Sequence, residues 1–368
     1  MYLNKKGKVP NQAHVGIPDG LCEEEHGREG FTGPVSHLYR THPPTGWVKI
    51  DGPLKPRAFA CTQLSTTSSS QAIGRQTLVM HSHDVRLYVS YRVKTMPHFV
   101  RDADGDEVYF MHQGRGRFET DYGTLSYEPG DYVVIPKGTT YRIHIDAGPA
   151  LFLIIETPEP ITLPDRGPLG QHALFDKGVL VAPELGPVEP PETQQEWEVH
   201  IKRQGDSTRV IYPFYPMDVV GWKGDLWVTK LNVRDFRPVT SPRYHLPPSV
   251  HMTFRAGSCL ISTFAPRPLE SDPESLRVPF YHRNADYDEV LFYHEGEFFS
   301  RAGIQPGMLT LHPQGIHHGP QPQAVKASVQ KAQTTEVAVM IESKTPFTVR
   351  PEMEAVELKD YALSWSRG

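Results

Sequence analysis

The stretch "DEVYFMHQG" at residues 106–114 returns almost unchanged as "DEVLFYHEG" at residues 288–296. The chain has 368 residues, which is enough for two domains of ordinary size. The repeat therefore predicts that one structural unit is built twice in this chain.

A second shared pattern follows each copy. It consists of a glycine, five residues and Pro-x-Gly, written "GDYVVIPKG" at 130–138 and "GMLTLHPQG" at 307–315. With glycine and proline at roughly 7% and 5% of residues, such a triplet is expected about 0.1 times in a chain of this length. Two occurrences, each shortly after the nine-residue repeat, indicate a duplicated fold and not a coincidence.

Short strands dominate the expected secondary structure. The chain holds 35 prolines and 30 glycines, and few apolar stripes keep a helical period for more than two turns. Apolar runs such as "DYVVIP" (131–136), "ALFLIIE" (150–156) and "EVAVMIES" (336–343) are typical of buried strands. We expect an all-β chain.

Composition excludes several classes of partner. The formal net charge is −5 without blocks of like charge, so neither a nucleic acid nor a membrane surface is expected as a partner. No stretch approaches the roughly 18 apolar residues of a membrane span, and the N-terminus lacks an apolar leader. The three cysteines are widely spaced, which fits neither a disulfide framework nor a CxxC metal site. A cytoplasmic protein is expected.

Together, E-x6-G and G-x5-P-x-G resemble the two sequence motifs of the cupin superfamily, whose small jelly-roll barrels often hold a metal. Two copies imply a bicupin. The expected division is an N-terminal domain with a degenerate barrel (1–156), a Pro-rich connecting segment (157–198), and a C-terminal barrel with the metal site and a tail (199–368). Eight prolines between 157 and 192 make a long helix or a sheet implausible in the connecting segment.

The second copy keeps a full set of metal donors. "HRNADYDE" supplies His282 and Glu289, and "PQGIHHG" supplies His318. Alternate residues of a strand share one face, so these side chains can meet inside a barrel. Asn284 stands where the cupin motif has its second histidine. Two histidines and one carboxylate are the set associated with non-haem Fe(II) sites that keep open positions.

The first copy has lost these donors. Val100, Asp102 and Tyr141 occupy the matching positions, and only Glu107 remains. Metal is therefore expected in the second barrel alone, with Glu107 retained for a hydrogen bond inside the first. Strand alternation places His112 and His294 on the face opposite to the two glutamates, where we expect outer-face residues.

Longer stretches resemble the homogentisate 1,2-dioxygenase family. They are "ITLPDRGPLG" (161–170), "FYPMDVVGWKG" (214–224), "PFYHRN" (279–284), "LHPQGIHHGP" (311–320) and "VMIES" (339–343). The resemblance implies an Fe(II)-dependent enzyme that uses O₂ to cleave the ring of homogentisate to maleylacetoacetate, a step of tyrosine and phenylalanine catabolism. It also implies a homo-oligomer, either a trimer or a hexamer.

The same resemblance assigns roles to individual residues. The iron ligands would be His282, Glu289 and His318. His245 in "SPRYHLPPS" matches an active-site histidine proposed as a base, and His312 matches another histidine close to the metal. Phe298 stands where the family has a tyrosine that bonds the second ring hydroxyl, and Phe298 and Asn284 are expected to face the substrate, a small aromatic dihydroxy acid.

Three other functions stay open. The first is a related dioxygenase for another hydroquinone-type or gentisate-type substrate, which the motifs do not separate. The second is an isomerase or decarboxylase with Mn(II) or Zn(II), although such cupins often use a four-ligand site that Asn284 would break. The third is a storage or ligand-sensing protein, for which a degenerate second site would be expected.

Overall fold

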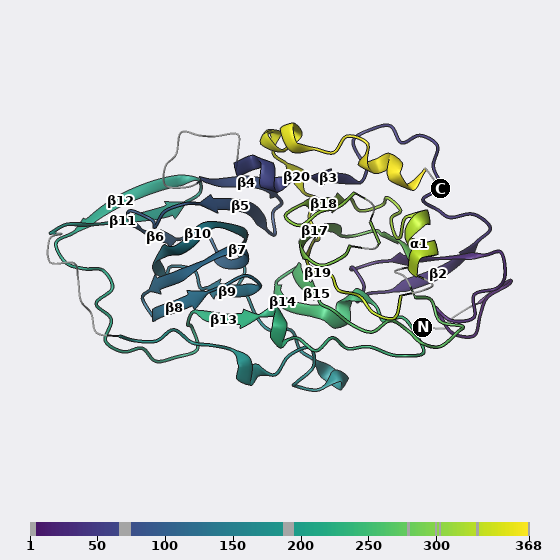
Figure 1. Ribbon diagram of the computed structural model, residues 1–368, viewed down its shortest axis with the longest axis horizontal. Coiled ribbons are helices and arrows are strands. Elements are labelled where there is room, and N and C mark those ends of the chain that lie inside the picture. The colour runs from purple at the N-terminus through teal and green to yellow at the C-terminus, as the bar shows by residue number, and fades with distance from the viewer. Residues whose placement is uncertain are drawn as a thin grey trace.

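In the residues that it describes, this computed structural model has three β-sheets, one α-helix and several short 3₁₀-helices (Figure 1). The structure describes residues 5–366 except 66–74, 187–194, 278–279, 299, 302 and 329–330. The chain is mostly β, as its sequence predicts. Within the described ranges, no helix is long and apolar enough to cross a membrane.

The largest sheet, called the N-terminal sheet below, has eleven strands. Its two longest strands, β7 and β10, pair antiparallel and bend at several register shifts. The strands are β4 (Arg75–His81), β5 (Arg86–Arg92), β6 (Phe99–Asp102), β7 (Asp106–Thr120), β8 (Gly123–Tyr127), β9 (Asp131–Ile135), β10 (Thr140–Thr157), β11 (Trp197–Arg203), β12 (Asp206–Tyr212), β13 (Thr229–Asn232) and β20 (Thr348–Val349).

Two further sheets belong to the other half of the molecule. The C-terminal sheet has six strands, and the hairpin sheet has three, in which a β-hairpin pairs with β16 in parallel. The C-terminal sheet consists of β3 (Arg57–Phe59), β14 (Met252–Ala256), β15 (Cys259–Phe264), β17 (Asp288–Glu295), β18 (Leu309–His312) and β19 (Val337–Ser343). The hairpin sheet consists of β1 (Cys22–Gly27), β2 (Val35–Arg40) and β16 (Tyr281–Asn284).

Helices are short and lie in the connections. The α-helix is α1 (Pro322–Ser328). The 3₁₀-helices are η1 (Cys61–Ser65), η2 (Gly167–Leu169), η3 (Lys177–Val179), η4 (Val233–Asp235), η5 (Pro248–His251), η6 (Pro351–Val356) and η7 (Tyr361–Trp365).

Strand pairing crosses the predicted domain boundaries. β11 pairs with β6 and β13 pairs with β9, so residues up to 232 belong to the N-terminal sheet. In the other direction, β3 from the first part of the chain pairs with β18 of the C-terminal sheet. The predicted boundary at residue 199 therefore does not coincide with the edge of either sheet.

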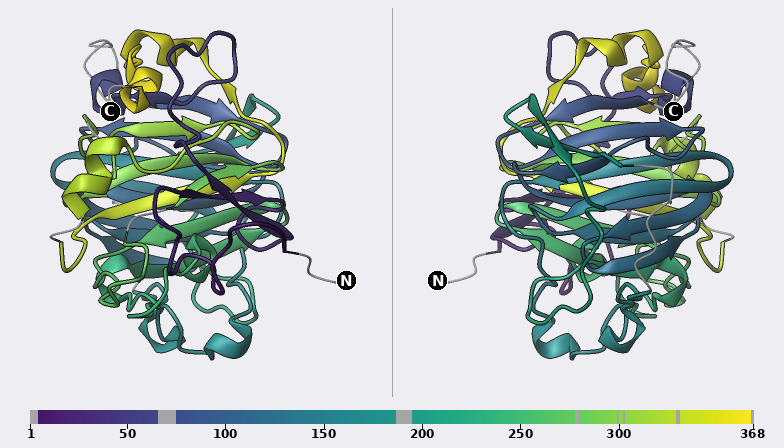
Figure 2. Two further views of the ribbon diagram at one scale, coloured as in Figure 1. Left: turned by 90° about the vertical axis from the view of Figure 1, so that its right-hand side faces the viewer. Right: turned by 90° about the vertical axis from the view of Figure 1, so that its left-hand side faces the viewer.

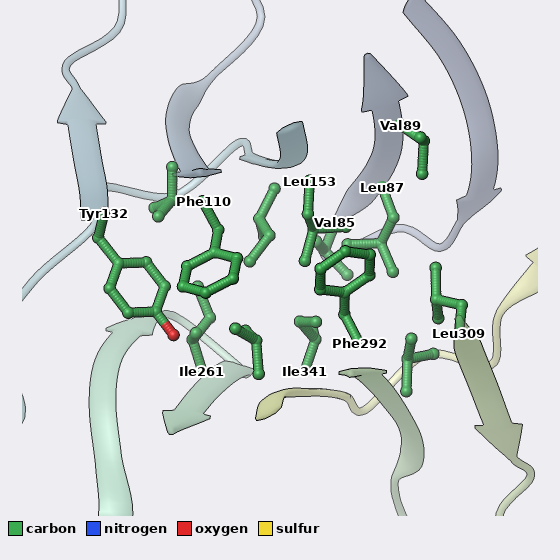
Figure 3. Close-up of a cluster of buried hydrophobic side chains, with 14 of the residues drawn as sticks. Val85, Leu87, Val89, Phe110, Tyr132, Leu153, Ile261, Phe292, Leu309 and Ile341 are labelled. Atoms are coloured by element: carbon green, nitrogen blue, oxygen red, sulfur yellow. The ribbon is translucent and has the colours of Figure 1, made fainter. Parts of the chain in front are cut away.

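A shared apolar core joins the N-terminal and C-terminal sheets (Figure 3). Along β7 the buried Val108 and Phe110 point into this core, and Val290 and Phe292 do the same from β17. The rings of Phe110 and Phe292 lie 6.2 Å apart at a steep angle. Burial of each such side chain contributes about 1.5 to 3 kcal/mol, so the packing of the two repeats against each other is a main source of stability.

His112 and His294 are expected on the outer face of the barrels. That expectation is wrong, because this face of each strand packs into the core shared by the two sheets. The two histidines lie opposite to their glutamates, as alternation requires, but that face is covered by the other sheet. Their Nδ1 atoms are 3.0 Å apart. Burial lowers the pKa of His112 to about 4 and that of His294 to about 3, so both rings are neutral at pH 7 and one donates to the other.

The glycines of the repeat have backbone angles that explain their retention. Gly114 and Gly296 have φ of 93° and 89°, and Gly138 and Gly315 have φ of 83° and 80°. Side chains rarely adopt this left-handed region, so glycine is the favoured residue. At Gly296 a Cβ would also lie 2.0 Å from the carbonyl oxygen of Thr335. Gly138, Gly296 and Gly315 lie in turns or bends, whereas Gly114 lies within β7 at a register shift.

The described part of the Pro-rich segment, residues 158–186, contains η2 and η3 and isolated bridges but no strand. Its bridges reach β8 at Thr124, β13 at Lys230 and β14 at Arg255. In both views of Figure 2 the segment (teal) runs along the lower edge of the molecule, below the stacked strands. The prediction that this stretch forms neither a long helix nor a sheet is confirmed for the described residues.

Candidate metal centre

The three predicted metal ligands meet at one buried point. His282 lies on β16, Glu289 near the start of β17, and His318 after the turn that follows β18. Backbone hydrogen bonds of 2.9 Å join His282 and His318 in both directions. Oε2 of Glu289 is 3.8 Å from Nε2 of His282, and its Oε1 is 3.5 Å from Nε2 of His318. Two ring nitrogens and one carboxylate therefore converge.

Hydrogen bonds to the backbone set the tautomers of both histidines. Nδ1 of His282 is 3.0 Å from the carbonyl oxygen of Phe280, and Nδ1 of His318 is 3.2 Å from that of Ile316. A carbonyl oxygen can only accept, so each Nδ1 carries the proton and each Nε2 presents a lone pair. Both Nε2 atoms are buried without a hydrogen-bond partner. Buried polar atoms rarely lack a partner, and a metal ion would satisfy both.

The electrostatics favour the protonation states that a metal needs. Burial lowers the pKa of His318 to about 3, so its imidazole is neutral. Burial alone would raise the pKa of Glu289, but the neighbouring rings of His318, His282 and His312 outweigh it and hold the pKa well below its usual value. A carboxylate and neutral imidazoles are the ligand forms that bind metal.

His312 holds the carboxylate of Glu289. Its Nδ1 donates to Oε1 of Glu289 over 2.8 Å, which leaves Nε2 to accept from the hydroxyl of Tyr361 at 3.2 Å. Its ring also stacks on that of His318, with centroids 4.6 Å apart. Through these contacts His312 positions Glu289 and His318. It lies beside the predicted metal ligands, as the resemblance to the family implies.

His245 shares a small cavity with the metal donors. The cavity has a volume of about 60 Å³, and its walls include His245, His282 and Glu289. Nδ1 of His245 lies 2.8 Å from Oε1 of Glu270. Because the Glu270 carboxylate can only accept, Nδ1 donates and Nε2 is left as an acceptor. Burial raises the pKa of Glu270, but the bond from His245 outweighs this and lowers it overall.

Two arginines that the sequence patterns do not reveal also line this cavity. Nη1 of Arg301 donates to the carbonyl oxygens of Gly319 and Ser300, at 2.6 and 3.1 Å. Arg267 lies 3.7 Å from the carboxylate of Glu336. Nε of Arg301 and Nη1 of Arg267 are buried without a hydrogen-bond partner. Both residues sit in loops that carry no motif, so only the tertiary fold places their charge beside the metal donors.

Two family models match this chain. They are "Homogentisate 1,2-dioxygenase N-terminal" over residues 48–232 and "Homogentisate 1,2-dioxygenase C-terminal" over residues 249–367. The chain belongs to the homogentisate 1,2-dioxygenase family. The two matches together cover most of the chain, and they confirm the resemblance seen in the motifs.

Individual relatives of the homogentisate 1,2-dioxygenase family differ in how much they share. A protein of Saccharolobus solfataricus, named as a candidate dioxygenase, is 33% identical over 99% of both chains. Homogentisate 1,2-dioxygenases of Bradyrhizobium diazoefficiens and Rhodopseudomonas palustris are 30% identical over 72% of this chain, which spans 62% of their length. Among solved structures, a cupin 2 conserved barrel domain protein of Leptotrichia buccalis aligns with 81% of this chain and 99% of its own, at 13% identity and a TM-score of 0.37.

The two residues expected to face the substrate lie outside the cavity walls. Oδ1 of Asn284 accepts the N–H groups of Asp286 and Tyr287, at 3.2 and 3.1 Å, and thereby forms the turn from β16 to β17. Phe298, at the position of the family's tyrosine, is buried edge-on against Tyr293 with centroids 4.9 Å apart. A substrate contact for either residue stays a prediction.

The hairpin that precedes the family match packs directly on the metal centre. β1 pairs with β16 so that Glu25 lies opposite His282. The ring of Phe31, which follows β1, lies 5.1 Å from that of His282 and lines the same cavity. This gives residues 22–40, whose role the sequence leaves unassigned, a structural part in the site.

The hairpin and His14, which precedes it, bring further histidines and carboxylates together. Donor atoms of His14, Glu25 and His37 lie within 4.8 Å of one another. Nδ1 of His14 is paired with Glu23, and Nε2 of His37 is 3.2 Å from Oε2 of Glu25. Burial lowers the pKa of His37, but the neighbouring glutamates outweigh it and raise it overall. These contacts form an ion-paired network that fixes the hairpin beside Phe280.

Proposed function

We propose that this protein is an Fe(II)-dependent dioxygenase that cleaves the aromatic ring of homogentisate or a closely related dihydroxy acid. The observation that carries the proposal is the buried set of His282, Glu289 and His318 with two unpartnered Nε2 atoms. Family membership supplies the reaction class, and the cavity supplies the residues for it.

His282, Glu289 and His318 would hold the iron. Two histidines and one carboxylate leave coordination positions open for substrate and O₂. Iron, when bound, supplies activation of the phenolic substrate and of O₂, and both oxygen atoms enter the product. The protein contributes the dry surroundings and the fixed ligand tautomers described above.

His245 is suited to take the proton of a phenolic hydroxyl. Its Nδ1–H is held by Glu270, so the lone pair of Nε2 is available to a substrate in the same cavity. A positioned imidazole is the commonest general base in proteins. The carboxylate of Glu270 stabilises the imidazolium that forms when the proton is taken.

Arg267 and Arg301 give the cavity its positive charge. Each has a buried nitrogen without a hydrogen-bond partner, and each is suited to meet the side-chain carboxylate of the substrate. The volume of about 60 Å³ is far below the roughly 300 to 1,000 Å³ of most ligand pockets. Admission of an aromatic acid therefore requires movement of the lining side chains, among which Phe31 belongs to the N-terminal hairpin.

The internal repeat supports two cupin-type jelly-roll barrels as the finer description of the fold. His318 bridges His282 in the second half, and Tyr141 pairs with Val100 in the first, at the positions that the motifs equate. A trimer or hexamer, as the family implies, completes the proposal.

A gentisate-type or other hydroquinone-type substrate is the second candidate. The observation in its favour is Phe298, which has no hydroxyl to offer the second ring hydroxyl of homogentisate. A buried hydroxyl left without a partner costs about 1 to 3 kcal/mol.

The test is O₂ uptake after anaerobic reconstitution with Fe(II), measured against homogentisate, gentisate and a simple hydroquinone acid. We expect uptake of one O₂ per substrate molecule with a ring-opened product, and no uptake by His318→Ala. No turnover of any of these acids by the iron-loaded wild type would contradict the proposal.

A further inference from the structure

In the first repeat, the positions that match the metal ligands contain a hydrogen-bonded trio of Glu107, Tyr141 and Tyr109. The hydroxyl of Tyr141 donates to Oε2 of Glu107 over 2.7 Å, and the hydroxyl of Tyr109 lies 2.7 Å from that of Tyr141. Burial, assisted by Asp102, raises the pKa of Glu107 to about 8, so this group is largely protonated at pH 7. The arrangement confirms the hydrogen bond predicted for Glu107 and leaves no donor set for a metal there.

A nearby acidic cluster is already neutralised. Asp102, Asp104 and Glu156 offer oxygen atoms close together. Nζ of Lys202 lies 2.7 Å from Oδ2 of Asp102 and also pairs with Glu156. The ammonium of Lys202 thus neutralises charge that a metal cation would otherwise meet.

A large cavity opens above the trio. Its volume is about 890 Å³, against about 60 Å³ beside the metal centre. Apolar and aromatic walls come from Leu78, Tyr88, Met96 and Val100, and Glu107 lies among the lining residues with both tyrosines of the trio. The size and the mixture of apolar walls with few polar groups are typical of sites for small organic molecules.

Arg92 gives this cavity an unpaired charge. It ends β5, lines the cavity and is 8% exposed. Among the described residues its side chain has no hydrogen bond and no ion pair, and its Nε is one of the buried atoms without a partner. Arg86 on the same strand, in contrast, is paired with Glu156 at 2.7 Å. A buried charge without a counter-ion is strongly unfavourable, so an anion is the missing partner.

We propose that this cavity of the N-terminal sheet binds a small aromatic monocarboxylate, whose carboxylate pairs with Arg92 and whose ring lies against Tyr88 and Met96. Arg92 is the lining cation whose side chain has no hydrogen-bond partner, whereas Lys202 is paired with the carboxylate of Asp102 and Arg101 donates to the hydroxyl of Thr140. One such guanidinium matches one carboxylate. A ring hydroxyl would meet the hydroxyls of Tyr109 and Tyr141. This site is separate from the metal centre and goes beyond the proposed reaction.

The test is isothermal titration of the full-length protein with 3-hydroxybenzoate and with its uncharged amide, 3-hydroxybenzamide. Titration of His318→Ala removes metal-dependent binding at the metal centre, and the Arg92 variant below separates the cavity from Arg267 and Arg301. We expect His318→Ala to bind 3-hydroxybenzoate as the wild type does and to bind the amide at least about 30-fold more weakly, the effect of losing one partner of a buried charge pair.

Two variants on the His318→Ala background locate the site. Arg92→Gln should weaken 3-hydroxybenzoate at least about 30-fold, whereas Arg115→Gln, an exposed arginine of β7 paired with Glu128, should leave it unchanged. Tyr141→Phe should weaken 3-hydroxybenzoate but not benzoate. Equal binding by Arg92→Gln and Arg115→Gln, equal binding of acid and amide, or no binding by His318→Ala would overturn the proposal. Because the readout is binding, failure of the proposed reaction would not affect it.

Discussion

In the proposed mechanism His245 takes the substrate proton but does not bind the metal, so changing it should affect turnover and not metal content. Changing it to Gln keeps a polar group beside Glu270 but removes the basic nitrogen. We expect kcat to fall by about 10² to 10⁴-fold, the usual contribution of a general acid–base group, while the iron content stays at the wild-type level. Steady-state kinetics and metal analysis of the same preparation check this, and unchanged turnover would refute the role of His245.

The Phe298→Tyr variant tests whether the site prefers a substrate ring with the second hydroxyl of homogentisate. If its missing hydroxyl relaxes the preference for homogentisate, Phe298→Tyr should raise kcat/KM for homogentisate relative to an analogue without the second hydroxyl. The expected gain is about 5 to 100-fold, corresponding to about 1 to 3 kcal/mol.

The ratio of the two kcat/KM values, in wild type and variant, is the measurement. A wild type that already rejects the analogue by more than about 10⁴-fold, the range of a site built to bond that hydroxyl, together with an unchanged ratio in the variant, would show that Phe298 does not set specificity. The homogentisate assignment would then be strengthened.

Glu107 makes stability depend on pH. Its pKa is about 8 in the folded protein, above the usual value of 4.5, because burial disfavours the charged carboxylate. Its favourable contribution is therefore fully present below about pH 4.5 and is lost as pH rises through 8. Glu107→Gln cannot ionise, so the free energy of unfolding of the variant relative to wild type should rise by roughly 2 to 5 kcal/mol between pH 5 and pH 9. A difference that stays constant across this range in denaturant titrations would contradict the protonated state.

At the scale of elements, the repeated glycines show how local sequence determines turns. Gly296 and Gly315 have similar positive φ, but only at Gly296 would a Cβ strike a backbone atom, since none lies within 4 Å at Gly315. Gly296→Ala should therefore cost at least about 2 kcal/mol more than Gly315→Ala, as expected when strain is added to the φ penalty. Chemical unfolding of both variants measures the difference, and equal losses would show that the turn after β17 adapts.

The sequence reveals the elements that depend on short-range patterns. The strands that begin at 106 and 288, the glycine after the second of them and the convergence of His282, Glu289 and His318 follow from the repeat, strand alternation and motif spacing. Alternation also places His112 and His294 on the face opposite to the glutamates. It does not tell which faces are covered, because a strand carries no local signal for the sheet that packs on it.

Other elements depend on long-range pairing, for which the sequence has no local mark. β11 and β12 join the N-terminal sheet although they follow the Pro-rich segment, and β1 and β2 dock on β16 from far along the chain. The cavity-lining arginines Arg92, Arg267 and Arg301 are similar cases. Each becomes significant only because the fold surrounds it with a cavity, and nothing in its neighbouring residues distinguishes it from an exposed arginine.

At the scale of the whole molecule, two repeats pack face to face and have diverged in chemistry. The shared core of Phe110, Phe292 and their neighbours retains the packing function of both repeats (Figure 3). The opposite faces differ, because the second repeat collects metal donors and the first collects Glu107, Tyr109 and Tyr141. If the second half holds the metal as proposed, the first has changed its interior without loss of the joint core.

The central claim, a single metal centre in the second repeat, is tested most directly by the iron content of the reconstituted protein. We predict about one iron per chain for wild type, little iron for His318→Ala, and a content near that of wild type for Glu107→Gln, which keeps the size and hydrogen bonding of the residue in the first repeat. Equal losses of iron in the two variants, or iron retained in His318→Ala, would contradict the claim.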